Sequence, residues 1–118
     1  MIERNLLAVL RRPLDQITNN EEGLRVAVGL TTANADVTVL LLDGAACLAT
    51  LPNAVSEEQQ GIHLYWETLA DLGVRRLVER ESLSEMGLDP EAVADGVTLV
   101  SRADVPGLLA LGDPVLVY

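Results

Sequence analysis

The chain has 118 residues, of which 49% are hydrophobic, so it can bury the core of one domain and is not intrinsically disordered. Its net charge of −10 argues against direct binding to nucleic acid or to an anionic membrane surface, since both rely on clusters of Lys and Arg. One cysteine cannot form an internal disulfide, and the first residues, MIERN, do not resemble a signal peptide. We therefore expect a cytoplasmic protein that contacts neither nucleic acid nor membrane.

The first third of the chain predicts a strand followed by a helix. Residues 6–10 (LLAVL) form an apolar run too short for a buried helix, which is typical of a central strand covered on both faces. Pro13 ends this strand because proline cannot donate to a sheet. Asn19 and Glu22 have the spacing of a helix capping box, so we expect a helix that begins there and reaches Thr31.

A second strand and an apolar helix are predicted next. Residues 37–42 (VTVLLL) indicate the strand, and the Asp-Gly pair at 43–44 indicates a turn. Residues 45–51 then predict a short helix that contains Cys47. The acidic stretch at residues 56–60 is interpreted as a loop.

The segment after this loop predicts a helix, a third strand and another helix. The first helix ends at Gly73, and the strand covers residues 74–78. Ser82 and Glu85 form a second capping-box pattern, which places the start of the next helix at Ser82. Gly87 is the expected end of that helix.

Two further strands complete the predicted fold. Asp89, followed by proline, indicates the start of a short helix. Val97–Val100 indicates the fourth strand. Asp104 is expected to cap a brief helix that reaches Leu111, before a last strand at residues 115–118.

Strands alternate with helical segments along the whole chain, which implies right-handed crossovers and a mostly parallel sheet. We therefore predict a single α/β domain over residues 1–118, with a five-stranded, mostly parallel sheet in flavodoxin-like order inside a three-layer α/β/α arrangement.

The sequence contains no motif for a nucleotide or a metal ion. The first strand is followed by RRPLDQITNNEEG, which has neither GxxxxGK[ST] nor GxGxxG. A zinc site is not expected from one histidine and one cysteine. His63, near a predicted helix start, is interpreted as a surface or boundary residue. We expect no bound cofactor and no metal.

Cys47 is the only thiol that the chain could use as a nucleophile. Its alanine and leucine neighbours favour a buried cysteine that behaves as a small hydrophobe. Its place in the first turn of the predicted helix favours the opposite, because a helix start can lower the pKa of a thiol. We favour the core interpretation and keep Cys47 as a weak catalytic candidate.

Charged residues follow four of the predicted strands, and a parallel sheet would bring them to one edge. They are Arg11 and Arg12, then Asp43, then Glu79 and Arg80, then Ser101 and Arg102. The four arginines, Arg11, Arg12, Arg80 and Arg102, could form a small anion site or a salt-bridged subunit contact. The alternative is that strand ends are simply where a chain reaches the surface.

Three stretches carry a family resemblance: LLLDGAACLA at residues 40–49, WETLADLGVRRLVERESLSEMGLD at 66–89 and LLALGDPVLVY at 108–118. The first resembles a strand that enters a helix through a Gly-Asp-Gly-type turn. The second resembles a helix, Gly-Val, a strand and an "RGL"-like close, and the third a last helix, an acidic turn and a final strand. Together they resemble the DsrE/DsrF/DsrH family of small sulfur-relay proteins.

The resemblance implies a cytoplasmic α/β subunit in persulfide transfer, for example in tRNA 2-thiouridine synthesis or sulfur oxidation. Sulfur-carrying members place a cysteine at the end of the third strand, a position that falls at or next to Glu79 here. A carboxylate cannot hold a persulfide, because that chemistry requires a thiolate. The chain therefore looks closer to the DsrF/TusC-type subunits, whose role is assembly, and no catalytic residue carries over.

Three hypotheses follow. The first is a non-catalytic subunit that forms a homo-oligomer, or a hetero-oligomer with other DsrE/F/H-like subunits. The second is a sulfur carrier that uses Cys47, and the third is an anion-binding domain with an arginine-lined rim. We rank them in that order, and we do not expect an enzyme.

Overall fold

Five parallel strands form the centre of the protein in the computed structural model, which describes residues 5–33, 35–50 and 56–118. The strands are β1 (Asn5–Leu10), β2 (Asp36–Leu41), β3 (Arg75–Glu79), β4 (Val97–Val100) and β5 (Val115–Val117). Every pair of neighbours is parallel, which confirms the predicted fold class.

The strand order is β4-β3-β2-β1-β5, so β2 lies between β1 and β3. The predicted flavodoxin-like order, 2-1-3-4-5, is therefore wrong, because it would place the first strand between the second and the third. Here the chain advances in one direction from β1 to β4 and reverses only once, before β5. Right-handed crossovers keep helices on one face while the direction is unchanged, so the single reversal moves only the last helix to the other face.

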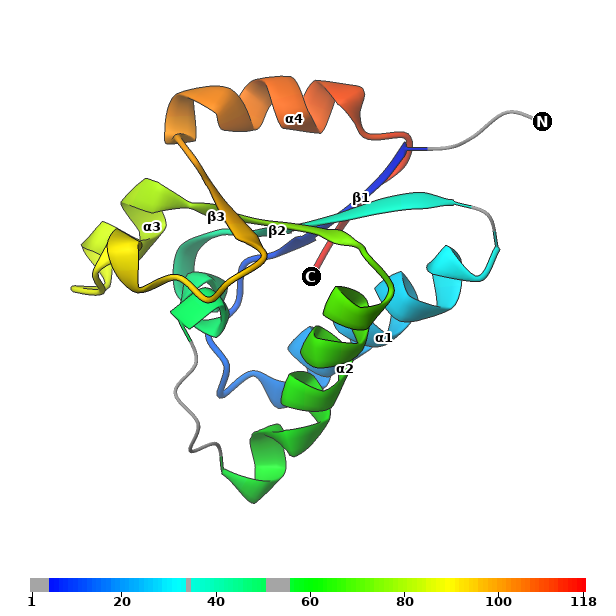
Figure 1. Cartoon of the computed structure of the whole chain (residues 1–118), viewed down its shortest axis with the longest axis horizontal. Coiled ribbons are helices and arrows are strands. Elements are labelled where there is room, and N and C mark those ends of the chain that lie inside the picture. The colour runs from blue at the N-terminus through cyan, green and yellow to red at the C-terminus, as the bar shows by residue number, and fades with distance from the viewer. Residues whose placement is uncertain (1–4, 34, 51–55) are drawn as a thin grey trace.

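The helical segments are distributed as this rule requires (Figure 1). The α-helices are α1 (Ile17–Thr31), α2 (Gln60–Asp71), α3 (Arg80–Glu85) and α4 (Val105–Leu111), and the 3-10 helices are η1 (Asp43–Thr50), η2 (Glu57–Gln59), η3 (Pro90–Ala92) and η4 (Arg102–Asp104). The helices α1 and α2 lie on one face of the sheet, and α4 lies on the other. The arrangement is the predicted three-layer α/β/α fold.

The two faces carry cores of different size. The larger core joins residues such as Leu10, Leu24, Val39 and Trp66, all of which are at most 2% exposed, between the sheet and the helices α1 and α2. The smaller core lies beneath α4, and its buried members among the described residues are Leu7, Val9, Leu40 and Val105. Because burial of apolar area stabilises the fold in proportion to its extent, most of the stability comes from the first face.

The helix α1 begins earlier than the capping-box pattern predicts. Its first residue is Ile17, so Asn19 lies inside the helix and caps nothing. The neighbouring Asn20 is buried instead, and its Nδ2 donates to the carbonyl oxygens of Pro13 (2.9 Å), Gln16 (3.0 Å) and Arg12 (3.2 Å). The side-chain amide thus provides hydrogen bonds for the backbone carbonyl groups between β1 and α1. The spacing of residues in the sequence does not reveal this role of Asn20.

Other predicted boundaries can be compared directly. The predicted loop at residues 56–60 is wrong from Glu57 onward, since η2 and the start of α2 occupy it. The helix predicted at residues 45–51 is η1, which begins at Asp43; position 51 lies outside the described residues. The predicted stops at Gly73 and Gly87 are confirmed, and both residues have a φ of +74°.

The predicted helix starts after residue 88 are confirmed in part. Asp89 accepts a hydrogen bond from the backbone N–H of Glu91 at 2.9 Å, as a capping residue should, but the helix is only η3. Asp104 precedes α4, yet its carboxylate accepts from the hydroxyl of Ser101 at 2.9 Å rather than from the helix. Within the described parts of the chain, no helix is long and apolar enough to cross a bilayer.

Two glycines of α1 should respond in opposite ways to substitution. A Cβ at Gly23 would lie 2.8 Å from the ring of Tyr118, whereas a Cβ at Gly29 would meet nothing within 4 Å. We expect Gly29→Ala to stabilise the protein by about 0.5–1 kcal/mol through helix propensity, and Gly23→Ala to destabilise it by about 1–3 kcal/mol through overpacking. Urea unfolding measures both; equal stabilisation by the two variants would contradict the packing of Tyr118 against α1.

Candidate functional site

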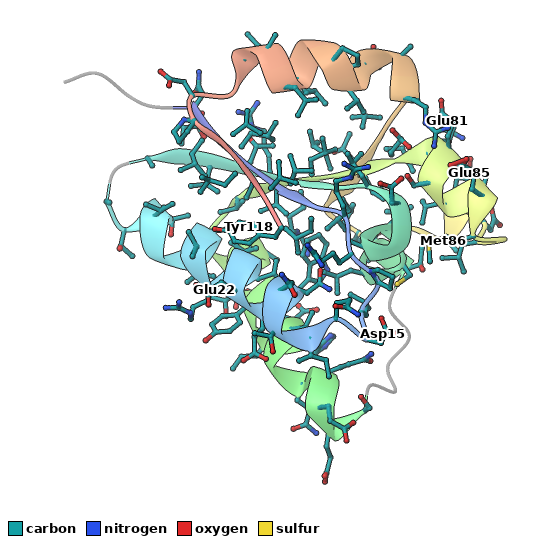
Figure 2. All side chains as sticks on the ribbon, turned by 180° about the vertical axis from the view of Figure 1, so that it is seen from behind. Asp15, Glu22, Glu81, Glu85, Met86 and Tyr118 are labelled. Atoms are coloured by element: carbon teal, nitrogen blue, oxygen red, sulfur yellow. The ribbon has the colours of Figure 1, made fainter. Side chains whose placement is uncertain are left out.

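The carboxyl ends of all five strands lie at one edge of the sheet, as the parallel pairing requires. Seven side chains from these ends and from α3 are linked there, and we call them the carboxyl-edge network: Arg11, Asp43, Glu79, Glu81, Ser82, Glu85 and Arg102. Two of them, Glu81 and Glu85, lie close together at α3 in Figure 2.

Glu79 is the centre of this network. It is the last residue of β3 and the residue that precedes α3, and it is only 4% exposed. Its Oε1 accepts hydrogen bonds from Nη2 (2.8 Å) and Nε (3.1 Å) of Arg102 and from the hydroxyl of Ser82 (2.7 Å). Burial of a charged carboxylate is costly because the group loses its contact with water. The ion pair and the three hydrogen bonds to Glu79 offset this cost.

Arg102 joins the end of β4 to α3. Besides Glu79, its guanidinium pairs with Glu85, and its backbone N–H donates to both carboxylate oxygens of Glu81 at 2.9 and 3.0 Å. The hydrogen bonds that its guanidinium donates, first to Glu85 and then to Glu79, raise the pKa of Arg102 above its ordinary value. The guanidinium therefore keeps its charge at any physiological pH and is held by two carboxylates, those of Glu79 and Glu85.

Ser82 extends the network to β2 and β1. Its hydroxyl donates to Glu79 and accepts from the backbone N–H of Asp43 at 2.8 Å. Asp43 has a φ of +49°, and its carboxylate pairs with Arg11 at 2.8 Å. A buried hydroxyl that uses both its donor and its acceptor in this way fixes the spacing between the two strand ends.

Sequence reasoning missed this role of Ser82. The capping-box pattern predicted that the helix begins at Ser82, but α3 begins at Arg80 with Glu79 as the preceding residue. Ser82 is 1% exposed and points into the sheet edge, not at the helix backbone. The role of Ser82 depends on the end of β2 lying beside α3. This contact joins segments far apart in the chain, so the local pattern could not predict it.

The four arginines proposed for the rim divide into two classes. Arg11 and Arg102 are paired with carboxylates. Arg12 and Arg80 are exposed, and no ion pair to either is found in residues 5–33, 35–50 and 56–118. Carboxylates outnumber guanidinium groups in the network itself, so its charge does not attract an anion. Anion binding by these arginines stays a prediction.

Cys47 lies in η1 and is partly buried. Its Sγ donates to the carbonyl oxygen of Gly44 at 3.4 Å. Burial is the largest influence on its pKa and raises it above the ordinary value of a thiol, against a smaller lowering by the backbone hydrogen bond. The thiolate fraction near neutral pH is correspondingly small, which disfavours nucleophilic chemistry at this residue.

His63 and the other metal-ligand candidates form no centre. The Nε2 of His63 lies 3.9 Å from Glu67 along α2, and His63 is partly buried, which agrees with the prediction of a surface or boundary residue. In the described part of the chain, no group of three or more His, Cys, Asp or Glu side chains could hold a metal ion.

Arg76 is a second buried charge that sequence reasoning missed. It is 7% exposed, stacks 4.7 Å above the ring of Trp66, and donates to the carbonyl oxygen of Asp95 at 3.4 Å. Burial lowers its pKa from the ordinary value of arginine, partly offset by Glu67. The cation–π contact lies in the interior of the fold, away from the carboxyl edge, and is a packing interaction.

Comparison with known proteins identifies the family. Residues 5–118 match the DsrE/DsrF-like family. The chain belongs to this family. The match covers nearly the whole sequence, and it confirms the resemblance inferred from the three sequence stretches.

Two solved structures share the fold of this DsrE/DsrF-like protein. The YchN protein from E. coli superposes with a TM-score of 0.84 at 18% identity, over 99% of this chain and 100% of that one. The protein of unknown function MTH1491 from Methanobacterium thermoautotrophicum gives 0.62 at 15% identity, with the same coverage. No curated protein matches the chain. At these identities the structural likeness establishes the fold alone.

The central role of Ser82 can be tested against a neighbour in the same helix. Ser82→Ala removes two hydrogen bonds and leaves the backbone N–H of Asp43 without its partner, so we expect a loss of about 1–3 kcal/mol in unfolding free energy. Ser84→Ala, at an exposed site of α3, should change it by less than about 0.5 kcal/mol. Denaturant titration compares the two; a neutral Ser82→Ala would show that the network is dispensable.

The raised pKa of Cys47 predicts slow alkylation near neutral pH. We expect the rate of iodoacetamide reaction to rise at a higher pH in the folded protein than in the chain unfolded by urea, because the folded state holds the thiol proton more tightly. Mass spectrometry follows the reaction. A folded protein that reacts at lower pH than the unfolded chain would mean that Cys47 is activated.

Proposed function

We propose that this protein is a non-catalytic subunit of a DsrE/DsrF-type assembly that takes part in persulfide relay, for example in tRNA 2-thiouridine synthesis or sulfur oxidation. Membership of the DsrE/DsrF-like family supports the class of function. The non-catalytic role rests on one observation, the state of Glu79.

According to the family resemblance, Glu79 stands at or next to the position where sulfur-carrying relatives place their cysteine. Its carboxylate is buried and is held by Arg102 and Ser82. A persulfide forms on a thiolate, which a carboxylate cannot replace. The position therefore contributes a structural ion pair where a carrier has a nucleophile, and this supports an assembly role.

The alternative carrier, Cys47, is disfavoured by its environment. It lies in η1 after β2, in a different loop from Glu79, and burial raises its pKa. Ala45, Ala46 and Leu48 around it are fully buried. These surroundings support the interpretation of Cys47 as a partly buried core residue.

Intact-mass spectrometry after incubation with a persulfide donor tests the absence of sulfur carriage. We expect the wild-type protein and Cys47→Ala to gain no sulfur that a reductant removes. A reducible sulfur on wild type that is lost in Cys47→Ala would make Cys47 the carrier and overturn the proposal.

The assembly role is tested separately by co-elution. The protein should co-elute in size-exclusion chromatography with a DsrE-type subunit from the same organism that does have the cysteine after its third strand. Failure of wild type to co-elute with such a subunit would contradict the assembly role.

A further inference from the structure

A depression of about 480 Å³ lies at the amino ends of β3 and β4, next to the turn that follows α2. Its apolar lining comes from Ala70, Val74 and Leu77. Its size lies in the range of sites that bind small molecules, roughly 300–1,000 Å³. The depression lies at the opposite edge of the sheet from the carboxyl-edge network, since β3 begins at Arg75 and ends at Glu79.

The charged side chains that line this depression are both cationic. They are Arg75 and Arg76, and no carboxylate is among the described residues that line it. The chain as a whole has 18 acidic residues and only 8 basic ones, so an all-cationic lining runs against its overall charge. A concave surface lined by one sign of charge attracts ligands of the opposite sign.

Arg76 is buried without a carboxylate partner. It is 7% exposed, and no ion pair to it is found in residues 5–33, 35–50 and 56–118, although Glu67 acts on it from a greater distance. Within the same residues its Nε has no hydrogen-bond partner. Its Nη2 donates to the carbonyl oxygen of Asp95 at 3.4 Å, beyond the usual range of roughly 2.7–3.2 Å. A buried cation in this state is costly, and a bound anion would offset the cost.

The guanidinium of Arg76 faces the depression. Its Nη2 lies 3.0 Å from the position that a Cβ on Gly96 would occupy, and Gly96 lines the depression. The guanidinium also stacks over the ring of Trp66, 4.7 Å from its centre. Stacking fixes the plane of the group but uses none of its donors, because the N–H groups of a guanidinium point outward from its edges. Donors therefore remain for a planar acceptor such as a carboxylate.

Arg75 and Thr98 provide further hydrogen-bond donors, since both line the depression. Arg75 pairs with Asp36 at 3.4 Å, and both side chains are exposed. An exposed ion pair of this kind contributes little to stability, so Arg75 can turn toward a ligand at small cost. Gly73 leaves room beside these donors, because a Cβ at that position would meet nothing within 4 Å.

We propose that this depression binds a small organic carboxylate. The carboxylate group of the ligand accepts hydrogen bonds from Arg76 and Arg75. The apolar body of the ligand packs against Ala70, Val74 and Leu77. An inorganic anion would leave this apolar lining without a contact, and a neutral apolar molecule would leave Arg76 without an acceptor. A ligand with a carboxylate at one end and an apolar body at the other matches both parts of the lining.

Ligand binding at this depression is independent of the sulfur-relay function. Sulfur carriage is tested at Cys47 in η1, and the assembly role is tested by co-elution with a partner subunit. Ligand binding is tested at Arg76, at the amino edge of the sheet. Either can fail while the other stands.

Nuclear magnetic resonance titration of the isotope-labelled protein with hexanoate tests the site, and hexanamide, which has the same carbon chain without the charge, is the control. We expect hexanoate to shift the amide resonances of residues 73–77 and 96–98 and the indole N–H of Trp66, the one tryptophan of the chain. Hexanamide should bind at least about tenfold more weakly, because it lacks the charge-assisted hydrogen bonds.

Three outcomes of this titration would overturn the proposal. The first is the absence of these shifts with hexanoate in the millimolar range. The second is equal binding of hexanamide, which would mean that the arginines have no role. The third is equally tight binding of inorganic sulfate, which would mean that the apolar lining contributes nothing to recognition.

Arg76→Met removes the charge and keeps an apolar side chain over Trp66. We expect this variant to bind hexanoate at least about tenfold more weakly and to remain folded, because an apolar side chain of similar volume replaces an uncompensated buried cation. The control Arg25→Met removes the same charge from an exposed position on α1 and should bind hexanoate as wild type does. Unchanged binding by Arg76→Met would contradict the proposed site.

A second pair of variants keeps the proposal falsifiable if Arg76→Met does not fold. Gly73 has a φ of +74°, a conformation that Asn and Asp adopt more readily than most residues, and an added Cβ has free space there. Gly73→Asp places a negative charge at the depression, whereas Gly73→Asn has the same shape without the charge. Gly73→Asp should bind hexanoate about fivefold more weakly than Gly73→Asn, through charge repulsion. Equal affinities of the two variants would show that the depression does not bind an anion.

Discussion

The direction in which the chain crosses its sheet determines most of this structure. From β1 to β4 each strand is added on the same side of the one before, and only the crossover to β5 runs back. Because such crossovers are right-handed, the first helices all cover one face and α4 alone covers the other. The same parallel winding brings the carboxyl ends of all five strands to one edge. The carboxyl-edge network and the thinly covered face are therefore two consequences of one topological constraint.

At the carboxyl edge, the protein buries Glu79 in a set of ion pairs, at or next to the position where the family resemblance places the cysteine of sulfur carriers. Removing Glu79 from water is costly for a charged group, and Arg102 and Ser82 offset that cost with three hydrogen bonds to one oxygen. The arrangement ties β3, β4 and α3 together and leaves no lone nucleophile. The network therefore has a structural role at this edge, and this is the observation on which our proposal of an assembly subunit rests.

The strands and several helix ends could be predicted from the sequence because their signals are local. The apolar run at residues 6–10 can lie only inside a sheet, and Gly87 can adopt the positive φ that ends a helix. Helix starts were predicted less well, since Asn19 and Ser82 both have the spacing of a capping residue but lie inside helices. The hydroxyl of a capping residue can bond either the helix backbone or a tertiary partner. At Ser82 it bonds Glu79 and the backbone N–H of Asp43, at the ends of β3 and β2.

The sequence by itself determined the fold class, the family resemblance and the presence of charges after four strands, because periodicity, turn residues and short motifs are read along the chain. Only the tertiary structure decided how those charges pair. Arg102 lies 23 residues from Glu79, and Asp43 lies 39 residues from Ser82. Nor could the sequence show that α4 stands alone on its face, because an all-apolar segment such as VPGLLAL normally signals burial. The strand order leaves α4 exposed, and that order depends on contacts between segments far apart in the chain.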